Sequence, residues 1–177
     1  MRTFIYDTET DGLIKSSAVR LEKQPRIIEL FGVVLNEHDQ EVETWQSLFA
    51  HPKPLDPIII DVTGITNDLL KDAPPFIDKA AELKQLLESC DRVVGHNLTF
   101  DRDMVNNEMR RCNMNVNWTR DMICTVEATE HYKGFRLGLN VLHEELFGER
   151  FKDAHRAEPD VRALVRCYIE LKKRGDV

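Results

Sequence analysis

Long apolar runs, a signal peptide and paired cysteines are all absent from this sequence of 177 residues. No apolar run approaches the roughly 20 residues that a membrane-spanning helix requires. The first ten residues, "MRTFIYDTET", lack the apolar region and the small-residue cleavage site of a secretory signal. We therefore expect a cytoplasmic protein that makes no contact with a membrane.

The cysteine pattern excludes both a disulfide framework and a zinc site. The four cysteines form no C-x-x-C pair, and no histidine stands near them at a zinc-ligand spacing. We expect reduced thiols, two or three of them in the core. The cysteines are Cys90, Cys112, Cys124 and Cys167.

Positive charge is also scarce, since the formal net charge is −7. This balance argues against a protein that holds nucleic acid through bulk positive charge. It leaves room for an enzyme whose acidic site is neutralised by bound cations. A hydrophobic content of 42% with 31% charged residues is typical of a globular chain, and no stretch resembles a linker, so we expect one domain over residues 1–177.

The apolar pattern predicts strands and helices in an order typical of an α/β sandwich built around a mixed sheet. Polar residues between the second and third strands favour an antiparallel hairpin. Expected strands cover residues 2–9, 25–37, 41–50 and 91–97, with a further short strand leading into a helix within 119–131. Expected helices cover residues 74–90, 98–113, 137–148 and 158–174.

The first strand ends in carboxylates. Because side chains alternate along a strand, Ile5, Asp7 and Glu9 share one face, and Phe4 and Tyr6 share the other. Carboxylates two positions apart lie about 6.6 Å from each other and can flank a cation. The alternative interpretation is a strand end that is simply solvated.

Two helices carry an acid within their apolar stripe. Asp101 lies in the stripe of the helix over 98–113, and Asp160 lies in that of the helix over 158–174. Each acid alone is equally well explained as a favourable charge near a helix N-terminus. Buried unpaired carboxylates are costly, however, and metal coordination is a standard remedy. Three such intrusions on three elements therefore indicate a metal site.

His155 precedes Asp160 by five residues. On one continuous helix this offset is about 140°, so the two side chains would not share a face. We therefore place His155 on the loop that enters the last helix, where it can reach the same site. A lone histidine is more often an ordinary surface or core residue, and only His96, near Asp101, has comparable context.

Three segments together resemble a known family. "DTETDGL" at residues 7–13, "GHNLTFD" at 95–101 and "HRAEPD" at 155–160 resemble the three motifs of the DEDD exonuclease superfamily. The H-x4-D spacing is similar to that of its histidine subgroup, DEDDh, which includes the proofreading epsilon subunit of DNA polymerase III, ribonuclease T and oligoribonuclease. The motifs stand in the family's order and span almost the whole chain.

The resemblance implies a ribonuclease H-like fold, with a central five-stranded mixed sheet flanked by helices. It also implies 3′→5′ hydrolysis of nucleic acid with two divalent cations. Oxygen ligands suit Mg²⁺ or Mn²⁺ rather than zinc. By the same resemblance, Asp7, Glu9 and Asp160 would bind one cation, Asp7 and Asp101 the other, and His155 would act as the general base.

Substrate contacts follow from the same motifs. Thr10 and Leu13 match positions that touch the terminal nucleotide in the family. Asn97 and Phe100 are candidates for the substrate groove, although Phe100 has an equal claim to a packing role. The loop over residues 14–26 either contacts phosphates beyond the scissile bond or is a solvated charge run. Its basic residues are Lys15, Arg20, Lys23 and Arg26.

The expected partner is a nucleic acid with a free 3′ end. Single-stranded DNA is the favoured substrate, and a 3′→5′ exoribonuclease acting on RNA or short oligoribonucleotides is the alternative. From other classes, a non-catalytic nucleic-acid-binding module and a metal-binding structural module remain. Release of mononucleotides that depends on a divalent metal would separate the enzyme from both. A polymerase or replication partner is not identified by the sequence.

Overall fold

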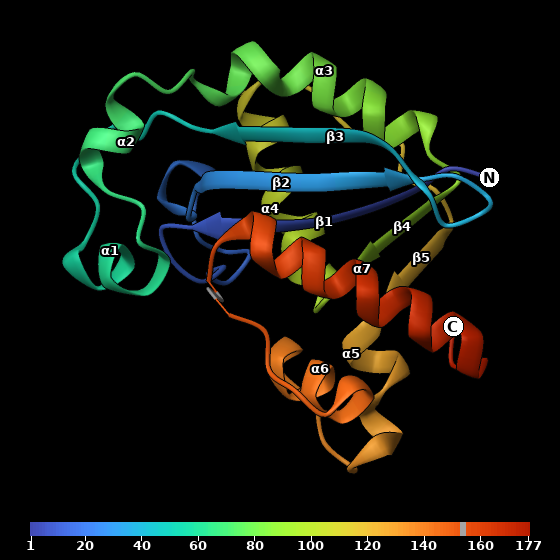
Figure 1. The fold of residues 1–177 in the computed structure, drawn as a ribbon. Helices are drawn as coiled ribbons and strands as arrows, with labels where there is room; N and C mark the ends of the chain where they lie inside the picture. The colour runs from blue at the N-terminus through green and yellow to red at the C-terminus, as the bar shows by residue number, and fades with distance from the viewer. Residues whose placement is uncertain (153–154) are drawn as a thin grey trace.

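A computed structural model describes residues 1–152 and 155–177 of the chain, and within them a mixed sheet of five strands forms the centre (Figure 1). The strand order is β3-β2-β1-β4-β5. The first three strands pair antiparallel, whereas β4 pairs parallel to both β1 and β5. The strands are β1 Thr3–Thr10, β2 Ile27–Leu35, β3 Glu41–Leu48, β4 Arg92–Gly95 and β5 Asp121–Cys124. The expected mixed sheet and hairpin are thus confirmed.

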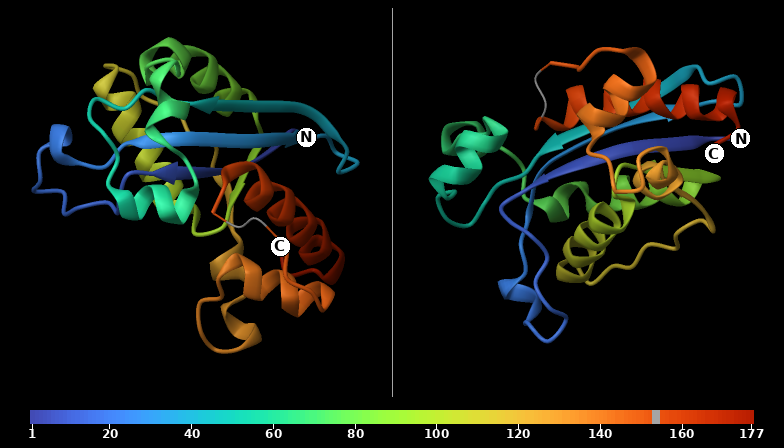
Figure 2. Two further views of the ribbon diagram at one scale, coloured as in Figure 1. Left: turned by 60° about the vertical axis from the view of Figure 1, so that its left-hand side comes forward. Right: turned by 90° about the horizontal axis from the view of Figure 1, so that it is seen from below.

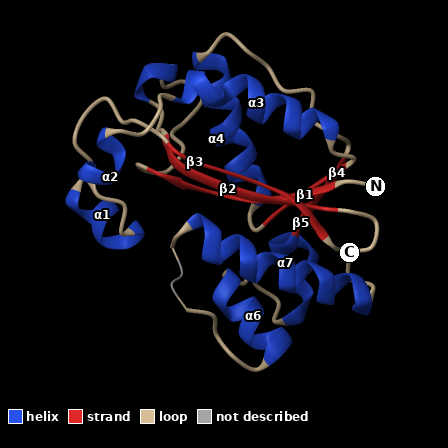
Figure 3. Cartoon of the chain, turned by 45° about the horizontal axis from the view of Figure 1, so that its top comes forward, coloured by secondary structure: helices blue, strands red, loops and turns tan. Residues whose placement is uncertain are grey.

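Helices cover both faces of this sheet (Figure 3). On one face lie α3 (Phe76–Ser89) and α4 (Leu98–Arg111), whose apolar stripes pack on β1, β2 and β4. On the other face lies α7 (Ala157–Arg174), with α6 (Leu139–Phe147) packed beside it. All four long helices were expected from their periodicity.

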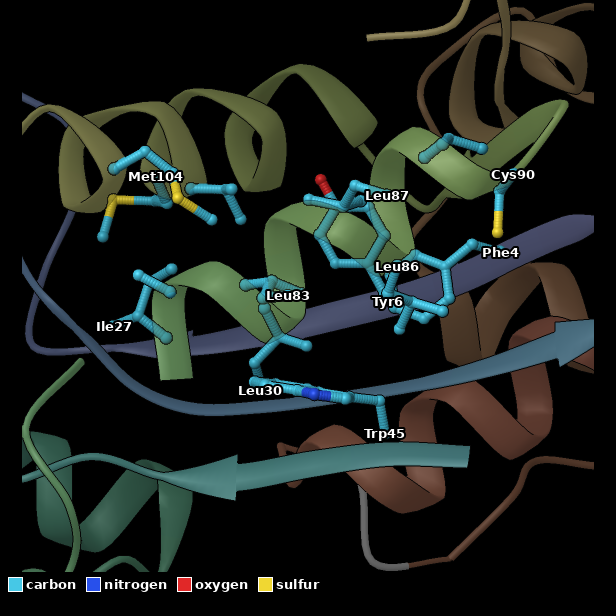
Figure 4. Packing of buried hydrophobic residues seen from close by; sticks show 14 of the residues in the cluster. Phe4, Tyr6, Ile27, Leu30, Trp45, Leu83, Leu86, Leu87, Cys90 and Met104 are labelled. Carbon is cyan, nitrogen blue, oxygen red and sulfur yellow. The ribbon is translucent and has the colours of Figure 1, made fainter. Parts of the chain in front are cut away.

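The alternation expected for β1 decides which layer each side chain enters. Phe4 and Tyr6 point to the α3 and α4 side, where their rings stack with centroids 5.3 Å apart beneath Leu83 and Leu87 (Figure 4). Ile5 joins the opposite core beneath α7. Asp7 and Glu9 therefore share the α7 face of the sheet, as predicted.

Two short helices between β3 and α3 were not expected. They are α1 (Pro57–Thr63) and α2 (Asn67–Lys71), and they lie beyond one end of the sheet (Figure 1). The side chain of Asp56 caps α1 by accepting from the N–H of Ile58, and Thr66 caps α2 by accepting from the N–H of Leu69. Three further elements are also short, namely η1 (Leu21–Lys23), α5 (Thr125–Ala128) and η2 (Glu130–Tyr132).

The cysteines are free thiols, as expected. Cys90 and Cys167 are buried, and Cys112 and Cys124 are half-buried. Burial raises the pKa of the Cys167 thiol to about 12, which keeps it protonated. Among the described residues, no helix combines the length and the apolar character that crossing a membrane would take.

Candidate active site

The site begins where β4 stops short of the end of β1. Residues Thr3 to Ile5 of β1 pair with β4, which ends at Gly95, and the chain then turns into α4 through Asn97 with φ 70° and ψ 43°. A Cβ at Gly95 would lie 2.9 Å from Leu98 Cδ1 and 3.1 Å from Leu98 Cα, so a larger residue would crowd this turn. The edge of β1 beyond Ile5 is therefore left without a strand partner on the β4 side.

Asp101 occupies that open edge. Its Oδ1 accepts hydrogen bonds from the backbone N–H of Thr8 at 3.1 Å and from the Thr8 hydroxyl at 2.6 Å. The N–H of Thr8 would otherwise be an unpaired donor, because β4 has already ended. Asp101 is 3% exposed, so the acid predicted within the α4 stripe is indeed buried. Both bonds end on one oxygen and leave the other for a ligand.

Asp7, Glu9 and Asp160 meet on the α7 face of the sheet. One carboxylate oxygen from each lies within 4.8 Å of the corresponding oxygens of the other two. Asp7 and Glu9 come from successive positions on one face of β1, and Asp160 comes from the first turn of α7. All three are half-buried. The structure thus brings together three of the four predicted acids, with Asp101 outside this set but close enough to repel Asp7.

Burial raises the pKa of every acid in this group, and repulsion from neighbouring carboxylates adds to it at Asp7 and Glu9. Burial, then the charge of Asp101, raises the pKa of Asp7 well above its ordinary range. Burial and Asp160 raise the pKa of Glu9 to about 8. Burial raises the pKa of Asp101 to about 7, against the opposing hydrogen bonds from Thr8, and that of Asp160 to about 6. The protein therefore holds these groups where they favour a proton or a cation.

Glu29 adds a fifth acid that the sequence analysis did not single out. It lies opposite Glu9 in the β1–β2 ladder and accepts from the guanidinium of Arg156 at 2.9 and 3.0 Å. It also accepts from the N–H of Ala157 at 3.1 Å, which ties the start of α7 to the sheet. The sequence pattern could have pointed to Glu29, because it is the one charged residue in the apolar run of β2.

His155 lies just before α7, as predicted, on the loop that enters the helix. Its backbone N–H donates to Asp160 Oδ2 at 3.1 Å, and its side chain is exposed. A φ of 71° places its backbone in the left-handed region, which histidine tolerates better than most residues. His155 therefore helps to place Asp160 through its backbone, while its side chain is exposed.

His96 is a structural residue despite its position in the second motif. Its ring contacts the hydroxyl of Thr125 at 2.9 Å and the carbonyl of Leu137 at 3.0 Å. Burial lowers its pKa to about 4, so the ring is neutral near pH 7. It holds the end of β4 against the segment that precedes α6.

The predicted substrate residues differ in exposure and in the contacts that they already make. Leu13 is 80% exposed, and the hydroxyl of Thr10 donates to the carbonyl of Gly12 at 2.8 Å. The side chain of Asn97 accepts from Arg136 at 2.9 Å. Phe100 is half-buried and packs against the core beneath α4. Leu13 is thus free to touch a ligand, whereas much of Phe100 is already committed to packing.

The donor set fits a hard divalent cation. All of the converging groups offer carboxylate oxygens. Such oxygen ligands suit Mg²⁺ or Mn²⁺ rather than zinc. Two oxygens bound to one Mg²⁺ lie at most about 4.2 Å apart, so a spread within 4.8 Å needs only small side-chain adjustments. A cation would also offset the repulsion that raises the pKa of Asp7 and Glu9.

Comparison with known proteins identifies the family of these motifs. Residues 4–168 match the exonuclease family named after ribonuclease T. The epsilon subunit of DNA polymerase III from Pasteurella multocida is 28% identical over 176 residues, which cover 96% of this chain and 68% of that subunit. The PolC-type DNA polymerase III of Bacillus subtilis is 30% identical over 174 residues, which cover 96% of this chain but 11% of that polymerase.

Solved structures show the same fold. E. coli exonuclease I in complex with a dA16 oligonucleotide superposes with a TM-score of 0.79 at 16% identity, covering 98% of this chain and 41% of that one. The nuclease domain of 3′hExo, a DEDDh family member bound to rAMP, superposes with a TM-score of 0.77 at 18% identity, covering 98% and 92%. The expected fold class is thereby confirmed.

Proposed function

The chain belongs to the exonuclease family, in its DEDDh branch of metal-dependent 3′→5′ phosphodiester hydrolases, and we propose that it degrades single-stranded DNA from the 3′ end. The products are nucleoside 5′-monophosphates. Residues 1–177 act as a single exonuclease domain. The relatives that contain a similar segment support a DNA substrate, since one is an epsilon subunit of DNA polymerase III and another is a PolC-type DNA polymerase III.

One observation carries the catalytic proposal, namely the convergence of carboxylate oxygens from Asp7, Glu9 and Asp160 within 4.8 Å. A module that merely binds nucleic acid gains nothing from this cluster, because its negative charge repels phosphate. In a hydrolase, the same cluster serves to bind cations, which neutralise its negative charge. This argument favours the enzyme over a non-catalytic binding module.

We assign two divalent cations, Mg²⁺ or Mn²⁺, to the acids. Asp7, Glu9 and Asp160 would hold one, and Asp7 with the free oxygen of Asp101 would hold the other. When bound, such cations activate the attacking water and stabilise the charge on the reacting phosphate and the leaving oxygen. Thr8 keeps Asp101 oriented, and Glu29 with Arg156 keeps the first turn of α7 over β1.

His155 accepts the proton of the attacking water on a ring nitrogen. Its ring is exposed at the mouth of the site, while its backbone N–H is bound to Asp160. Because only the backbone of His155 binds Asp160, the ring can approach the substrate without disturbing Asp160. A general base of this kind typically accelerates the reaction 10²–10⁴-fold.

The terminal nucleotide is held by Thr10 and Leu13 on one side and by Asn97 and Phe100 on the other. The exposed Leu13 side chain offers an apolar surface to the last base. A second candidate substrate is RNA, because a structural neighbour with a TM-score of 0.77 is a 3′-exonuclease that recognises the 3′ end of a histone mRNA stem-loop. That neighbour is 16% identical to this chain, so it supports the fold and leaves DNA as the first choice.

A time course on four matched oligomers tests the proposal. Single-stranded DNA and RNA of one sequence are labelled at either end and incubated with Mg²⁺, with Mn²⁺, or with excess chelator. We expect immediate release of mononucleotide from the 3′ label, a ladder of shortening products from the 5′ label, and no reaction in chelator. Cleavage of circular single-stranded DNA at a comparable rate would overturn the exonuclease assignment, and faster loss of RNA would reverse the substrate preference.

A further inference from the structure

A basic cleft lies beside the β1–β2 loop, outside the cluster of acids. It has a volume of about 490 Å³ and is lined by the loop itself and by the segment after β3. Its cationic lining residues are Lys15, Lys23, Arg26 and Lys53, and the exposed Leu13 stands at its margin. We propose that this cleft binds the phosphodiester backbone of the substrate strand, on the 5′ side of the terminal nucleotide. The proposal rests on the exonuclease function given above.

The charge of the cleft supports an anionic ligand. Its two acids are Asp11 and Glu22, and the Asp11 carboxylate is already paired with His51 Nε2 at 3.0 Å. The other ring nitrogen of His51 lies 2.5 Å from the carbonyl of Lys53, and the second oxygen of Asp11 accepts from the backbone N–H of Arg26 at 2.5 Å. Both oxygens of Asp11 are therefore already hydrogen-bonded within the protein.

Three lysines remain available in the cleft. Lys15, Lys23 and Lys53 are exposed and make no ion pair with any residue in 1–152 or 155–177. Arg26 is partly engaged, with its guanidinium 3.8 Å from Glu108. A chain of net charge −7 thus presents a local excess of positive charge next to an acidic centre. Lysine side chains bind phosphates as point charges, without demanding one geometry.

The loop that carries two of these lysines is braced before any ligand arrives. The buried side chain of Gln24 donates to the carbonyls of Lys15 and Ser16 and accepts from the N–H of Lys15. The guanidinium of Arg111, on α4, donates to backbone carbonyls of the same loop, those of Leu21, Gln24 and Pro25. Arg111 is itself paired with the buried Glu108 at 2.7 Å. A loop held in this way loses little entropy when it binds a strand.

The cleft lies at the end of β1 that carries the acids, as binding of the upstream part of the substrate strand requires. Asp11 lines the cleft and follows Glu9 by two residues, a span of about 6.6 Å in extended chain. The N–H of Asp11 donates to the carbonyl of Arg26, which closes the loop onto the strand end. Figure 2 shows this loop, in blue, projecting beyond the sheet past the end of β1. A strand whose last nucleotide rests at Leu13 and the acids can therefore continue into the cleft.

Two substrates of different length separate binding in the cleft from chemistry at the acids. The short one is the p-nitrophenyl ester of thymidine 5′-monophosphate, which has one phosphodiester and cannot reach the cleft. The long one is a single-stranded DNA 12-mer. The test variant is the triple Lys15→Ala, Lys23→Ala, Lys53→Ala. The control triple, Lys79→Ala, Lys133→Ala, Lys173→Ala, makes the same change in net charge at exposed or half-buried lysines outside the cleft.

For the test variant we expect a KM for the 12-mer raised about tenfold, since three exposed charge contacts are lost. The slope of log KM against log salt concentration should fall by about 2, at roughly 0.7 for each phosphate contact on a single strand. Hydrolysis of the short ester should stay within twofold of wild type, and the control triple should resemble wild type on both substrates.

The outcomes distinguish this inference from the function on which it rests. An unchanged KM and salt slope for the 12-mer, with the ester hydrolysed normally, would show that the strand does not use the cleft. Equal losses on the ester and the 12-mer would show that the lysines act at the reacting phosphate, and would overturn the cleft assignment. Failure of the wild type to hydrolyse either substrate would refute the proposed function itself.

Discussion

Thr8 donates two hydrogen bonds to a single oxygen of Asp101, one from its N–H at 3.1 Å and one from its hydroxyl at 2.6 Å. These bonds lower the pKa of Asp101, while burial raises it to about 7. Thr8→Val removes the hydroxyl bond, keeps the shape and leaves a buried carboxylate less well satisfied. We expect the activity at pH 7 to fall about tenfold and the rate–pH curve to move up by about one unit, since a hydrogen bond to a charged group contributes about 1.5–3 kcal/mol.

Thr8→Ser is the matched control, because it restores the hydroxyl without the methyl group. Rates measured from pH 6 to 9 at saturating Mn²⁺ check both variants, with circular dichroism to show that the fold persists. A Thr8→Val enzyme with a wild-type pH profile would show that Thr8 has no influence on the ionisation of Asp101.

The raised pKa values of the site acids predict an unusual dependence of stability on pH. The folded protein binds protons more tightly than the unfolded chain, since Glu9 shifts from 4.5 to about 8 and Asp160 from 3.8 to about 6. Their contribution to stability is therefore complete below about pH 4 and is lost as pH rises towards 8. In chelator, the melting temperature should fall between pH 5 and pH 8.

Divalent metal should reverse this loss. Because the acids must be deprotonated to bind a cation, added Mn²⁺ should raise the melting temperature more at pH 8 than at pH 5. Thermal melts at both pH values, with and without Mn²⁺, check this. Glu41 and Glu88 have lowered pKa values and act below about pH 4.5, outside this range. His96, whose pKa is lowered from 6.5 to about 4, opposes the fall only up to about pH 6.5, and the raised acids outweigh it. A metal-induced shift that is larger at pH 5 would contradict the assignment of these acids as ligands.

Asp7→Asn should separate stability from activity. The substitution keeps the shape of the side chain and removes the charge that Asp101, Glu9 and Asp160 repel. In chelator at pH 8, we expect the melting temperature to rise by about 2–4 °C, which corresponds to roughly 1 kcal/mol for a chain of this size. Turnover should fall by about 10²–10³-fold or more, because an electrostatic contact to the reacting centre is lost. A variant that is both less stable and fully active would refute the role of Asp7.

The acids of the candidate site were predictable because they break local patterns. Alternation along β1 placed Asp7 and Glu9 on one face, and helical periodicity placed Asp101 and Asp160 within apolar stripes. The long helices followed from the same periodicity. Glu29 also broke a pattern, as the charged residue within the buried β2, and the same criterion applied to every strand would have found it.

Other features depended on tertiary contacts that no local pattern records. Thr8 matters because β4 ends early, and that ending is visible only when β1 and β4 are paired. Glu108 lies seven residues after Asp101 and so on the same face of α4. Only the structure shows, however, that Arg111 and the N–H of Ile27 satisfy it at 2% exposure. The helices α1 and α2 have 7 and 5 residues, too few to establish a period.

Gly32 is expected to be essential for the packing of β1 on β2. A Cβ at this position would lie 2.3 Å from the Phe4 ring and 3.0 Å from the Cβ of Tyr6. The ring is fully buried and has no space to move, so Gly32→Ala should destabilise the protein by about 1–3 kcal/mol or more. Urea unfolding monitored by fluorescence measures this. Gly138→Ala is the control, since a Cβ there meets nothing within 4 Å and the backbone has φ −75° and ψ 155°. Equal midpoints for the two variants would contradict the close approach.

His155 should be required for turnover but not for metal binding. Its only hydrogen bond to Asp160 comes from the backbone N–H, which a side-chain replacement leaves in place. His155→Ala should therefore lose about 10²–10⁴-fold in kcat, as expected for a missing general base. Calorimetric titration with Mn²⁺ should give the same stoichiometry as wild type, whereas Asp160→Ala should lose both metal binding and turnover.

The backbone of His155 calls for a second variant. Its φ of 71° is unfavourable for alanine but tolerated by asparagine, so His155→Asn preserves the loop while removing the base. His131→Ala, at a histidine with a 63% exposed side chain, serves as the control. If His155→Asn binds Mn²⁺ normally and is as slow as His155→Ala, the ring acts in proton transfer. If His155→Asn recovers near wild-type turnover, the loop conformation was the essential property and the proposed base must be sought elsewhere.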